Sequence, residues 1–366
     1  MKISNDYQKL ADHLSQLAMS FPVRDDLMDI LKEIFTQEEA GVALCVPTNV
    51  IPMNPASIET IQQSSDLPEY ELQKIIDGLV QKNLLFVGKT DDGQVGYALH
   101  QVGFGFPQSF FWKREDTPHA RKMAGLIGKY FNRHVTREAY GTPTKTYRYI
   151  PVAESLEPEL QAVYPLHLME SVIEGANYFA VAHCPCRVAY KLSGRECDHP
   201  LEVCLKFNDL GRYLVERGLG REVSKEEALQ IIRISEEAGL VHFVDNSGGE
   251  INHNCNCCGC ACWNVGNIKR RKIKRDDIMA TYFMRKTNTD DCAGCGDCVD
   301  ICPVDALKMQ ENLPLVDEEW CIGCGVCATV CPTDAARMKI REDKTGELPA
   351  TSPKELHQKI LMEKNS

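Results

Sequence analysis

The sequence predicts an α+β fold of several domains, in which helices and strands are mixed along the chain. Three observations lead to this prediction. Apolar residues recur at helical spacing in the N-terminal third, and short strand-like runs bounded by turn residues follow. Of the 18 cysteines, Cys45 stands alone, and the rest gather in residues 184–204, 255–262 and 292–331. A chain of 366 residues is also too long for one ordinary domain.

The N-terminal third, residues 1–103, is expected to form a small helical domain with a hairpin. Helices are predicted around residues 27–35, 57–63 and 66–80, followed by two strands around the turn at Asp92-Gly93. This order resembles a winged helix. The third helix has a net charge of −1 over residues 67–82, whereas a helix that enters a DNA groove is expected to be basic. A docking or scaffold role is therefore favoured over DNA binding.

Composition and charge narrow the function classes. The net charge of −11 argues against nucleic acid as the main partner, because phosphate contacts need a basic face. The sequence has no apolar run long enough to span a bilayer, and its start lacks the pattern of a signal peptide. We expect a cytoplasmic protein, where clustered cysteines serve as metal ligands or reactive thiols rather than as disulfides.

Residues 104–268 are expected to form a central cysteine-rich α+β domain. Helices are predicted over residues 117–132, 157–176 and 224–238, the last with a capping box at Ser224 and Glu227. "TKTYRYIPV" and "NYFAVAHC" are predicted strands. Residues 269–287 are expected to be a basic linker that begins with "KRRKIKR". This basic run has three alternative interpretations: a nucleic-acid patch, a docking strip for an acidic protein, or a solvated face.

Two matching cysteine runs give the strongest signal. Cys292-x2-Cys295-x2-Cys298-x3-Cys302-Pro is repeated as Cys321-x2-Cys324-x2-Cys327-x3-Cys331-Pro. Three thiolates on a glycine-loosened loop can hold three corners of an iron–sulfur cube, and backbone N–H groups can offset its charge. In this pattern the fourth cysteine of each run serves the other cluster. The predicted ligand sets are thus Cys292, Cys295, Cys298 and Cys331, and Cys321, Cys324, Cys327 and Cys302.

Residues 288–340 resemble the bacterial-type ferredoxin with two [4Fe–4S] clusters. The resemblance implies a βαββαβ module, placed at residues 288–342 with a C-terminal tail over 343–366, and one-electron transfer at low potential. Two all-cysteine zinc sites are the alternative. Residues 288–340 hold ten Asp or Glu against three Lys or Arg, which favours a redox partner with a basic docking face.

Nine cysteines remain in the centre of the chain. They are Cys184, Cys186, Cys197 and Cys204, followed by Cys255, Cys257, Cys258, Cys260 and Cys262. The adjacent pair Cys257 and Cys258 points to opposite faces of an extended strand, so in a turn eased by Gly259 the two can serve two separate centres. One or two further [4Fe–4S] clusters are favoured, with structural zinc or reactive-cysteine chemistry as alternatives. Cys45 is expected to be a buried small residue.

The segments "CPCR" and "CNCCGC" resemble those of larger multi-cluster iron–sulfur proteins of anaerobes, which join a CxCR segment and a CNCC knot to a two-cluster ferredoxin module. His183, His199 and His253 flank these cysteines and are expected mainly to hydrogen-bond to ligands. No catalytic acid or base is predicted. We expect an electron carrier or an electron-transfer subunit that works with a partner oxidoreductase. A redox-sensing regulator that uses the winged helix, or a catalytic subunit with substrate at a central cluster, is the alternative.

Overall fold

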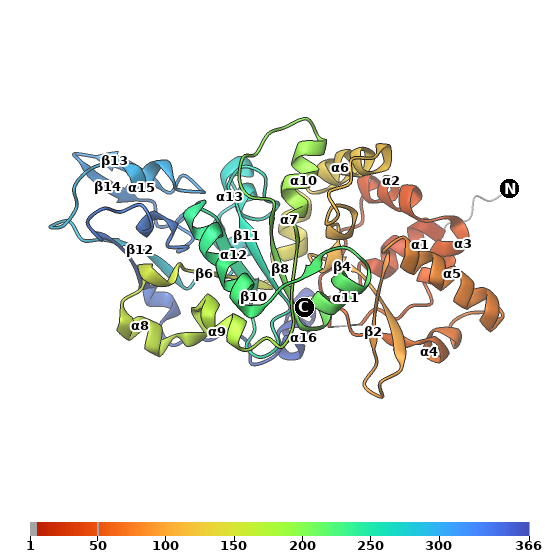
Figure 1. Ribbon diagram of the computed structural model, residues 1–366. Helices are drawn as coiled ribbons and strands as arrows, with labels where there is room; N and C mark the ends of the chain where they lie inside the picture. Colours follow the sequence, from red (N-terminus) through yellow and green to blue (C-terminus); the bar gives the residue numbers. More distant parts are fainter. Residues whose placement is uncertain (1–5, 50, 366) are drawn as a thin grey trace.

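The computed structural model describes residues 6–49 and 51–365. Helices and strands are mixed throughout, which confirms the α+β class. The helical N-terminal segment lies at one end of the molecule and the C-terminal cysteine runs lie at the other, with a large sheet between them (Figure 1). Within the described residues, no helix is both long enough and apolar enough to cross a membrane.

The N-terminal segment contains the helices and the hairpin that were predicted. Its three-stranded sheet has the order β1-β3-β2, and Thr36 forms a capping box with Glu39 at the start of α3. The elements are α1 (Asp6–Leu14), α2 (Asp25–Ile34), α3 (Gln37–Ala43), β1 (Ala56–Ser57), α4 (Ile58–Gln62), α5 (Glu69–Gln81), β2 (Leu85–Lys89) and β3 (Val95–Leu99).

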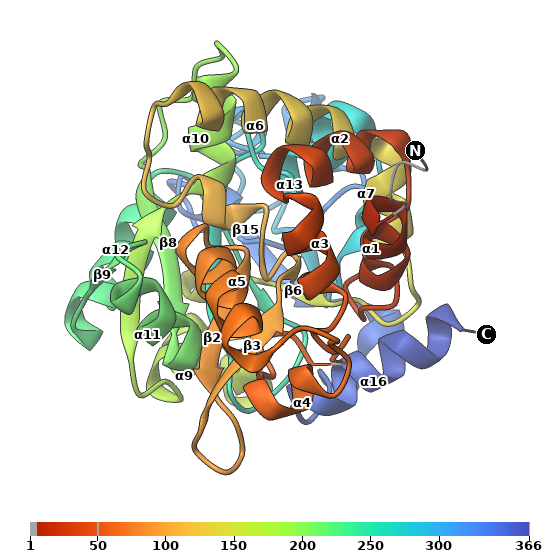
Figure 2. The ribbon, with the colours of Figure 1, turned by 90° about the vertical axis from the view of Figure 1, so that its right-hand side faces the viewer.

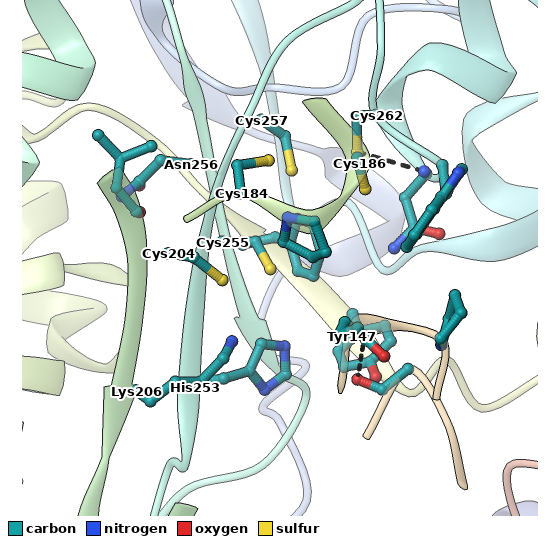
Figure 3. A pocket seen from close by; sticks show the side chains of 18 of the residues that line it. Tyr147, Cys184, Cys186, Cys204, Lys206, His253, Cys255, Asn256, Cys257 and Cys262 are labelled. Atoms are coloured by element: carbon teal, nitrogen blue, oxygen red, sulfur yellow. Dashed lines mark hydrogen bonds between the residues drawn. The ribbon is translucent and has the colours of Figure 1, made fainter. Parts of the chain in front are cut away.

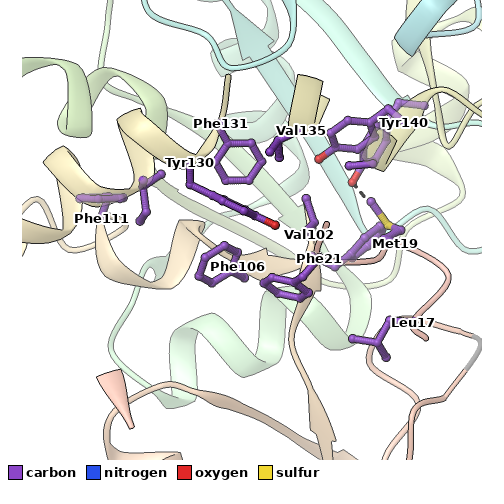
Figure 4. Packing of buried hydrophobic residues seen from close by; sticks show 14 of the residues in the cluster. Leu17, Met19, Phe21, Val102, Phe106, Phe111, Tyr130, Phe131, Val135 and Tyr140 are labelled. Carbon is purple, nitrogen blue, oxygen red and sulfur yellow. Dashed lines mark hydrogen bonds between the residues drawn. The ribbon is translucent and has the colours of Figure 1, made fainter. Parts of the chain in front are cut away.

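The N-terminal segment packs directly on the centre of the chain (Figure 2). Tyr213 of α11 (Asn208–Glu216) donates a hydrogen bond to the Leu85 carbonyl at 3.3 Å, and Arg217 donates to the Val80 carbonyl at 2.6 Å. Aromatic side chains also contribute to this contact. The ring centroids of Phe21 and Phe106 lie 4.8 Å apart beneath α6 (Pro118–Tyr130) (Figure 4). One hydrophobic cluster therefore joins the two regions. Strands β4 (Gln101–Val102) and β5 (Gly105–Phe106) and helix α7 (Arg133–Tyr140) complete this part.

A six-stranded antiparallel sheet with the order β6-β10-β11-β8-β7-β9 forms the centre. One face packs against α12 in an apolar cluster, and the other faces α10. The strands are β6 (Tyr147–Ile150), β7 (Phe179–His183), β8 (Glu202–Phe207), β9 (Arg221–Glu222), β10 (Val241–Asp245) and β11 (His253–Cys257), and the helices are α10 (Pro185–Leu192) and α12 (Lys225–Glu237).

The long helix expected over residues 157–176 is wrong. The segment is divided into α8 (Pro158–Val163), a 3-10 turn (Pro165–His167) and α9 (Met169–Glu174). Pro165 has no backbone N–H to continue a helix and disfavours helical backbone at Tyr164, whose φ and ψ are −122° and 54°. The helices expected over 117–132 and 224–238 are present, and the Ser224 hydroxyl accepts from the Glu227 N–H at 3.1 Å.

The C-terminal module has the element order β12, α15, β13, β14, a 3-10 turn and β15. Strand β12 lies within the segment expected to be a linker, yet it pairs with β15. The elements are α13 (Val265–Arg271), α14 (Arg275–Ile278), β12 (Phe283–Thr287), α15 (Asp297–Asp300), β13 (Leu307–Gln310), β14 (Leu313–Val316), the turn Val326–Ala328, β15 (Ala336–Ile340) and α16 (Pro353–Lys364). Helix α16 returns to the middle of the molecule, where Lys364 donates to the Ala18 carbonyl at 2.8 Å.

Arg148 of β6 joins three segments through backbone carbonyls. Its fully buried guanidinium donates to Asp245, to Ser247 at 2.8 Å and to Leu166 at 2.9 Å. We expect Arg148→Leu to lower the free energy of unfolding by about 3 kcal/mol, because three buried carbonyls lose their donor. Thermal and denaturant unfolding should be compared with Arg133→Leu, which removes an exposed arginine of α7. Equal stability of the two variants would contradict this role.

Candidate functional site

Six cysteines line one pocket on the α10 side of the central sheet, and their thiols gather around a common space (Figure 3). The six-thiol group comprises Cys184, Cys186, Cys204, Cys255, Cys257 and Cys262. Their thiols form a row of neighbours: Cys184 is next to Cys186, Cys186 to Cys262, Cys262 to Cys257, Cys257 to Cys255, and Cys255 to Cys204. Six thiols in this arrangement, four on buried and two on half-buried residues, could act as the donor set of a metal centre, since soft thiolate ligands select iron–sulfur clusters, zinc or copper(I).

Strand alternation explains how the sheet supplies half of this group. Residues two apart on a strand point to the same face, so His253, Cys255 and Cys257 of β11 share one face. His253 lies opposite Lys206 of β8, which places Cys204 on that face as well. Cys184 and Cys186 come from the first turn of α10 on the other side of the pocket.

Lys206 is the buried cation of the six-thiol group. Burial lowers its pKa, but the neighbouring Cys204 and Cys255 raise it above the usual value overall. Hydrogen bonds with Cys204 and Cys257 in turn hold the pKa of Cys255 well below that of a free thiol. The pocket thus favours a thiolate at Cys255 with the ammonium group beside it.

A second group of atoms that could ligate a metal lies next to the six-thiol group. The side-chain donors of Cys197, His199, Cys258 and Cys260 all lie within 4.8 Å of one another. The adjacent Cys257 and Cys258 therefore belong to different groups, which is the divergence that the sequence analysis expects of this pair. Arg187 lies between the groups, and although burial lowers its pKa, Cys184 and Cys258 raise it, so the arginine stays charged.

Arg270 of the basic strip 269–275 holds the knot of residues 255–262. Its guanidinium donates to three carbonyls of the knot, those of Gly259 at 3.0 Å, Cys260, and Cys262 at 3.0 Å. Lys269 binds Asp305 at 2.8 Å, so the same strip also reaches the C-terminal module. The strip therefore connects the knot with the C-terminal module, and its positive charges also balance nearby acidic residues.

In the C-terminal module, one predicted ligand set lies together. Cys302, Cys321, Cys324 and Cys327 line a single small pocket. Their sulfur atoms also receive backbone donors, since the Arg285 N–H lies 3.4 Å from Cys321 Sγ and the Ala306 N–H lies 3.3 Å from Cys302 Sγ. N–H···S contacts of this kind suit thiolates that ligate a cluster. Gly323 and Gly325 have φ values of 63° and 74°, which non-glycine residues rarely adopt.

The other predicted set lies closer to the surface. Cys298 is buried and Cys331 is half-buried in the same apolar cluster, whereas Cys295 is exposed. Cys292 is half-buried in the same loop as Cys295. The buried guanidinium of Arg285 lies beside Cys298 and Cys327, one thiol from each set, and these thiols raise its pKa against the effect of burial. A single positive charge thus serves both sets.

The knot packs against the set of Cys302, Cys321, Cys324 and Cys327, called the Cys302 set below. A Cβ at Gly259 would collide with the carbonyl of Pro303, the residue after Cys302, so only glycine allows this approach. Tyr149 of β6 is buried, and burial, more than the nearby thiols of Cys262, Cys257 and Cys324, raises its pKa well above 10. The six-thiol group and the Cys302 set are therefore neighbours within one protein interior.

Three residues of the site were either missed or given another role by the sequence analysis. Lys206 and Arg285 were not singled out, and His199 was expected to serve as a hydrogen-bond partner rather than a ligand. Lys206 has a local signal, because it stands two residues after Cys204 on a predicted strand and so shares its face. Arg285 and His199 depend on contacts far along the chain.

Comparison with known families matches residues 291–335 to the 4Fe-4S dicluster domain. The C-terminal segment is thus a ferredoxin-like 4Fe–4S module, as its cysteine runs predicted. The match covers the C-terminal module and leaves the rest of the chain unassigned. No curated protein matches the chain.

Removal of Arg270 tests how the knot is held. We expect Arg270→Met to loosen residues 259–262 and to reduce the metal bound by the centre of the chain, because three carbonyls lose charge-assisted hydrogen bonds. Bound metal and the alkylation rate of the knot cysteines are the measurements. Lys272→Met, an exposed position in the same strip, is the matched control and should change neither. A normal metal content in Arg270→Met would rule out this role.

Proposed function

We propose that the protein is a multi-cluster iron–sulfur electron-transfer protein that passes single electrons to or from a partner oxidoreductase. One observation carries the proposal: the knot of residues 255–262, which supplies three of the six thiols, packs directly against a ferredoxin-like 4Fe–4S module within the same chain. A centre that serves only stability has no need of this neighbour, whereas an electron carrier needs its centres close together.

The residues present fit iron–sulfur clusters at three places. The two C-terminal sets would hold one [4Fe–4S] cluster each, and the six-thiol group offers more than the four thiolates that a further cluster needs. Clusters of this type, when bound, take up and release single electrons at potentials set by charge, hydrogen bonds and exposure. The chain supplies Lys206 and Arg285 as buried positive charges, and apolar surroundings exclude water.

An order of transfer follows from burial. The six-thiol group is buried, and the Cys302 set lies next to it across Tyr149 and the contact of Gly259 with Pro303. The Cys292 set includes the exposed Cys295 and lies closest to solvent. Electrons would enter or leave through this last set, and the centre of the chain would be the other end of the route.

The surface around Cys295 fits a protein partner. Exposed apolar side chains of the β13–β14 hairpin, Met309, Leu313 and Leu315, lie on the module that carries the acidic excess. Gly296 of the cysteine loop packs close to Met309. An apolar centre with an acidic rim suits a partner with a basic rim, and electrostatic attraction would speed the encounter.

The iron content of the full chain tests the proposal. Three four-iron clusters give about twelve irons and twelve sulfides per chain in anaerobically purified protein. The triple variant Cys204→Ser, Cys255→Ser, Cys257→Ser leaves three thiols in the central group, so we expect about eight irons to remain. Cys45→Ser is the matched control and should keep all the iron. About eight irons in the unaltered protein would contradict the central cluster, and none would contradict the whole proposal.

Lys206 should set the potential of the central cluster. A unit charge acting over roughly 8 Å at an effective dielectric constant of about 20 contributes about 2 kcal/mol, or about 90 mV for one electron. We expect Lys206→Met to make the central potential more negative by about this amount, since the reduced state loses a stabilising cation. Redox titration followed by EPR is the measurement. Lys191→Met, at an exposed position of α10, should leave the potential unchanged, and an equal shift in both variants would refute the assignment.

A further inference from the structure

The geometry points to a second metal site in the centre of the chain: a mononuclear zinc ion held by Cys197, His199, Cys258 and Cys260. This site is separate from the six-thiol group and does not depend on the proposed electron-transfer function. It assigns His199 as a ligand.

The distances between the donor atoms fit one small ion. Cys260 Sγ lies 3.2 Å from both Cys197 Sγ and Cys258 Sγ, and the latter two lie 3.9 Å apart. His199 Nδ1 lies 3.5 Å from Cys197 Sγ and 3.8 Å from Cys260 Sγ. A tetrahedral zinc ion with bonds of about 2.3 Å to sulfur holds its sulfur ligands roughly 3.8 Å apart. The four atoms therefore outline the coordination shell of a single ion.

The same distances disfavour an iron–sulfur cube at this place. A cube separates its four ligand sulfurs widely, because four irons and four sulfides lie between them. Here one sulfur pair lies 3.9 Å apart and two pairs lie 3.2 Å apart, close to or slightly below the separation around one shared zinc ion. Three thiolates and one imidazole form a complete zinc shell with no position for substrate, which is typical of a structural site.

The surroundings of the four residues support an anionic metal site. Three thiolates and a neutral imidazole around Zn²⁺ carry a net charge of −1, and the Arg187 guanidinium lies beside Cys258. The Ala261 N–H lies 3.4 Å from Cys258 Sγ, as expected for a ligating thiolate. Cys197 is buried although residues 193–196 before it and Asp198 after it are exposed. Coordination of a shared ion would explain why the Cys197 thiol of this exposed loop is buried.

The site would join two parts of the chain that the sheet does not join. Cys197 and His199 lie in the connection between α10 and β8, and Cys258 and Cys260 lie in the knot about sixty residues later. Helix α10 begins with Cys184 and Cys186, and the knot carries Cys257 and Cys262, so both partners also line the six-thiol pocket. The zinc ion would fix the two walls of that pocket relative to each other.

Metal analysis of the full chain, purified anaerobically, tests the assignment. We expect about one zinc ion per chain beside the iron, and a zinc-edge X-ray absorption spectrum with three sulfur ligands and one nitrogen ligand. His199→Ala and Cys260→Ser should lose at least nine-tenths of the zinc and keep the iron. His199→Cys supplies a fourth thiolate and should keep the zinc. His134→Ala, at an exposed position of α7, is the control and should match the unaltered protein.

The outcomes separate this assignment from the proposed function. Zinc that persists in the triple variant of the six-thiol group, while iron falls, supports two independent sites. Iron that falls in Cys260→Ser, with no zinc in the unaltered protein, would overturn the zinc site and leave the electron-transfer proposal standing. If Cys260→Ser does not fold, the zinc spectrum of the unaltered protein and the comparison of His199→Ala with His199→Cys still decide.

Discussion

A thiolate buried away from water is stable only beside a positive charge, a hydrogen-bond donor or a metal ion. This chain buries many thiols in one continuous interior, and its other features answer that requirement. Lys206, Arg187 and Arg285 are buried cations, each placed beside thiols from different segments. Residues of this kind are costly to bury without a partner, so their positions mark where negative charge is held.

Backbone geometry meets the same requirement at the loops. The cysteine loops of the C-terminal module turn through left-handed glycines, and two N–H groups from outside these turns, those of Arg285 in β12 and of Ala306, reach the sulfur atoms of Cys321 and Cys302. In the central knot the Arg270 guanidinium donates hydrogen bonds to the outward-facing carbonyls, which leaves the thiols facing inward. Charge compensation and loop shape are thus parts of one arrangement, because a carbonyl turned toward a thiolate would repel it.

Local sequence rules predicted most of the helices and strands and the C-terminal 4Fe–4S module. Spacing alone led to the 4Fe–4S module at residues 291–335, and helical periodicity with the Ser224 cap led to α12. The helix expected over 157–176 was wrong because Pro165 interrupts the helical hydrogen bonding in the middle of the segment. Alternation predicted that Cys257 and Cys258 diverge, but which other cysteines join each of them depends on contacts between distant segments, such as the pairing of β8 with β11, which no local rule gives.

The position of the N-terminal segment bears on the choice between an electron carrier and a DNA-binding regulator. Just after β3 the chain reaches the six-thiol pocket, where Gly103, Pro107 and Gln108 form part of the wall. Gly103 has a φ of 89°, and a Cβ there would collide with the Tyr147 hydroxyl, so the backbone is held against the pocket. The segment that follows continues to Trp112, whose carbonyl lies 3.0 Å from His183 Nδ1, beside Cys184.

The N-terminal segment is thus tied to the six-thiol pocket by Gly103 at its end and by the residues that directly follow it. Helix α5, which corresponds to the third predicted helix, carries three acidic residues against one lysine, with two of the acidic residues in its first turn, which suits a protein contact better than a DNA groove. Both observations favour a scaffold role in which the N-terminal segment keeps solvent away from the central centre. Exclusion of water lowers the local dielectric constant, and this strengthens the electrostatic attraction between Lys206 and the neighbouring thiolates.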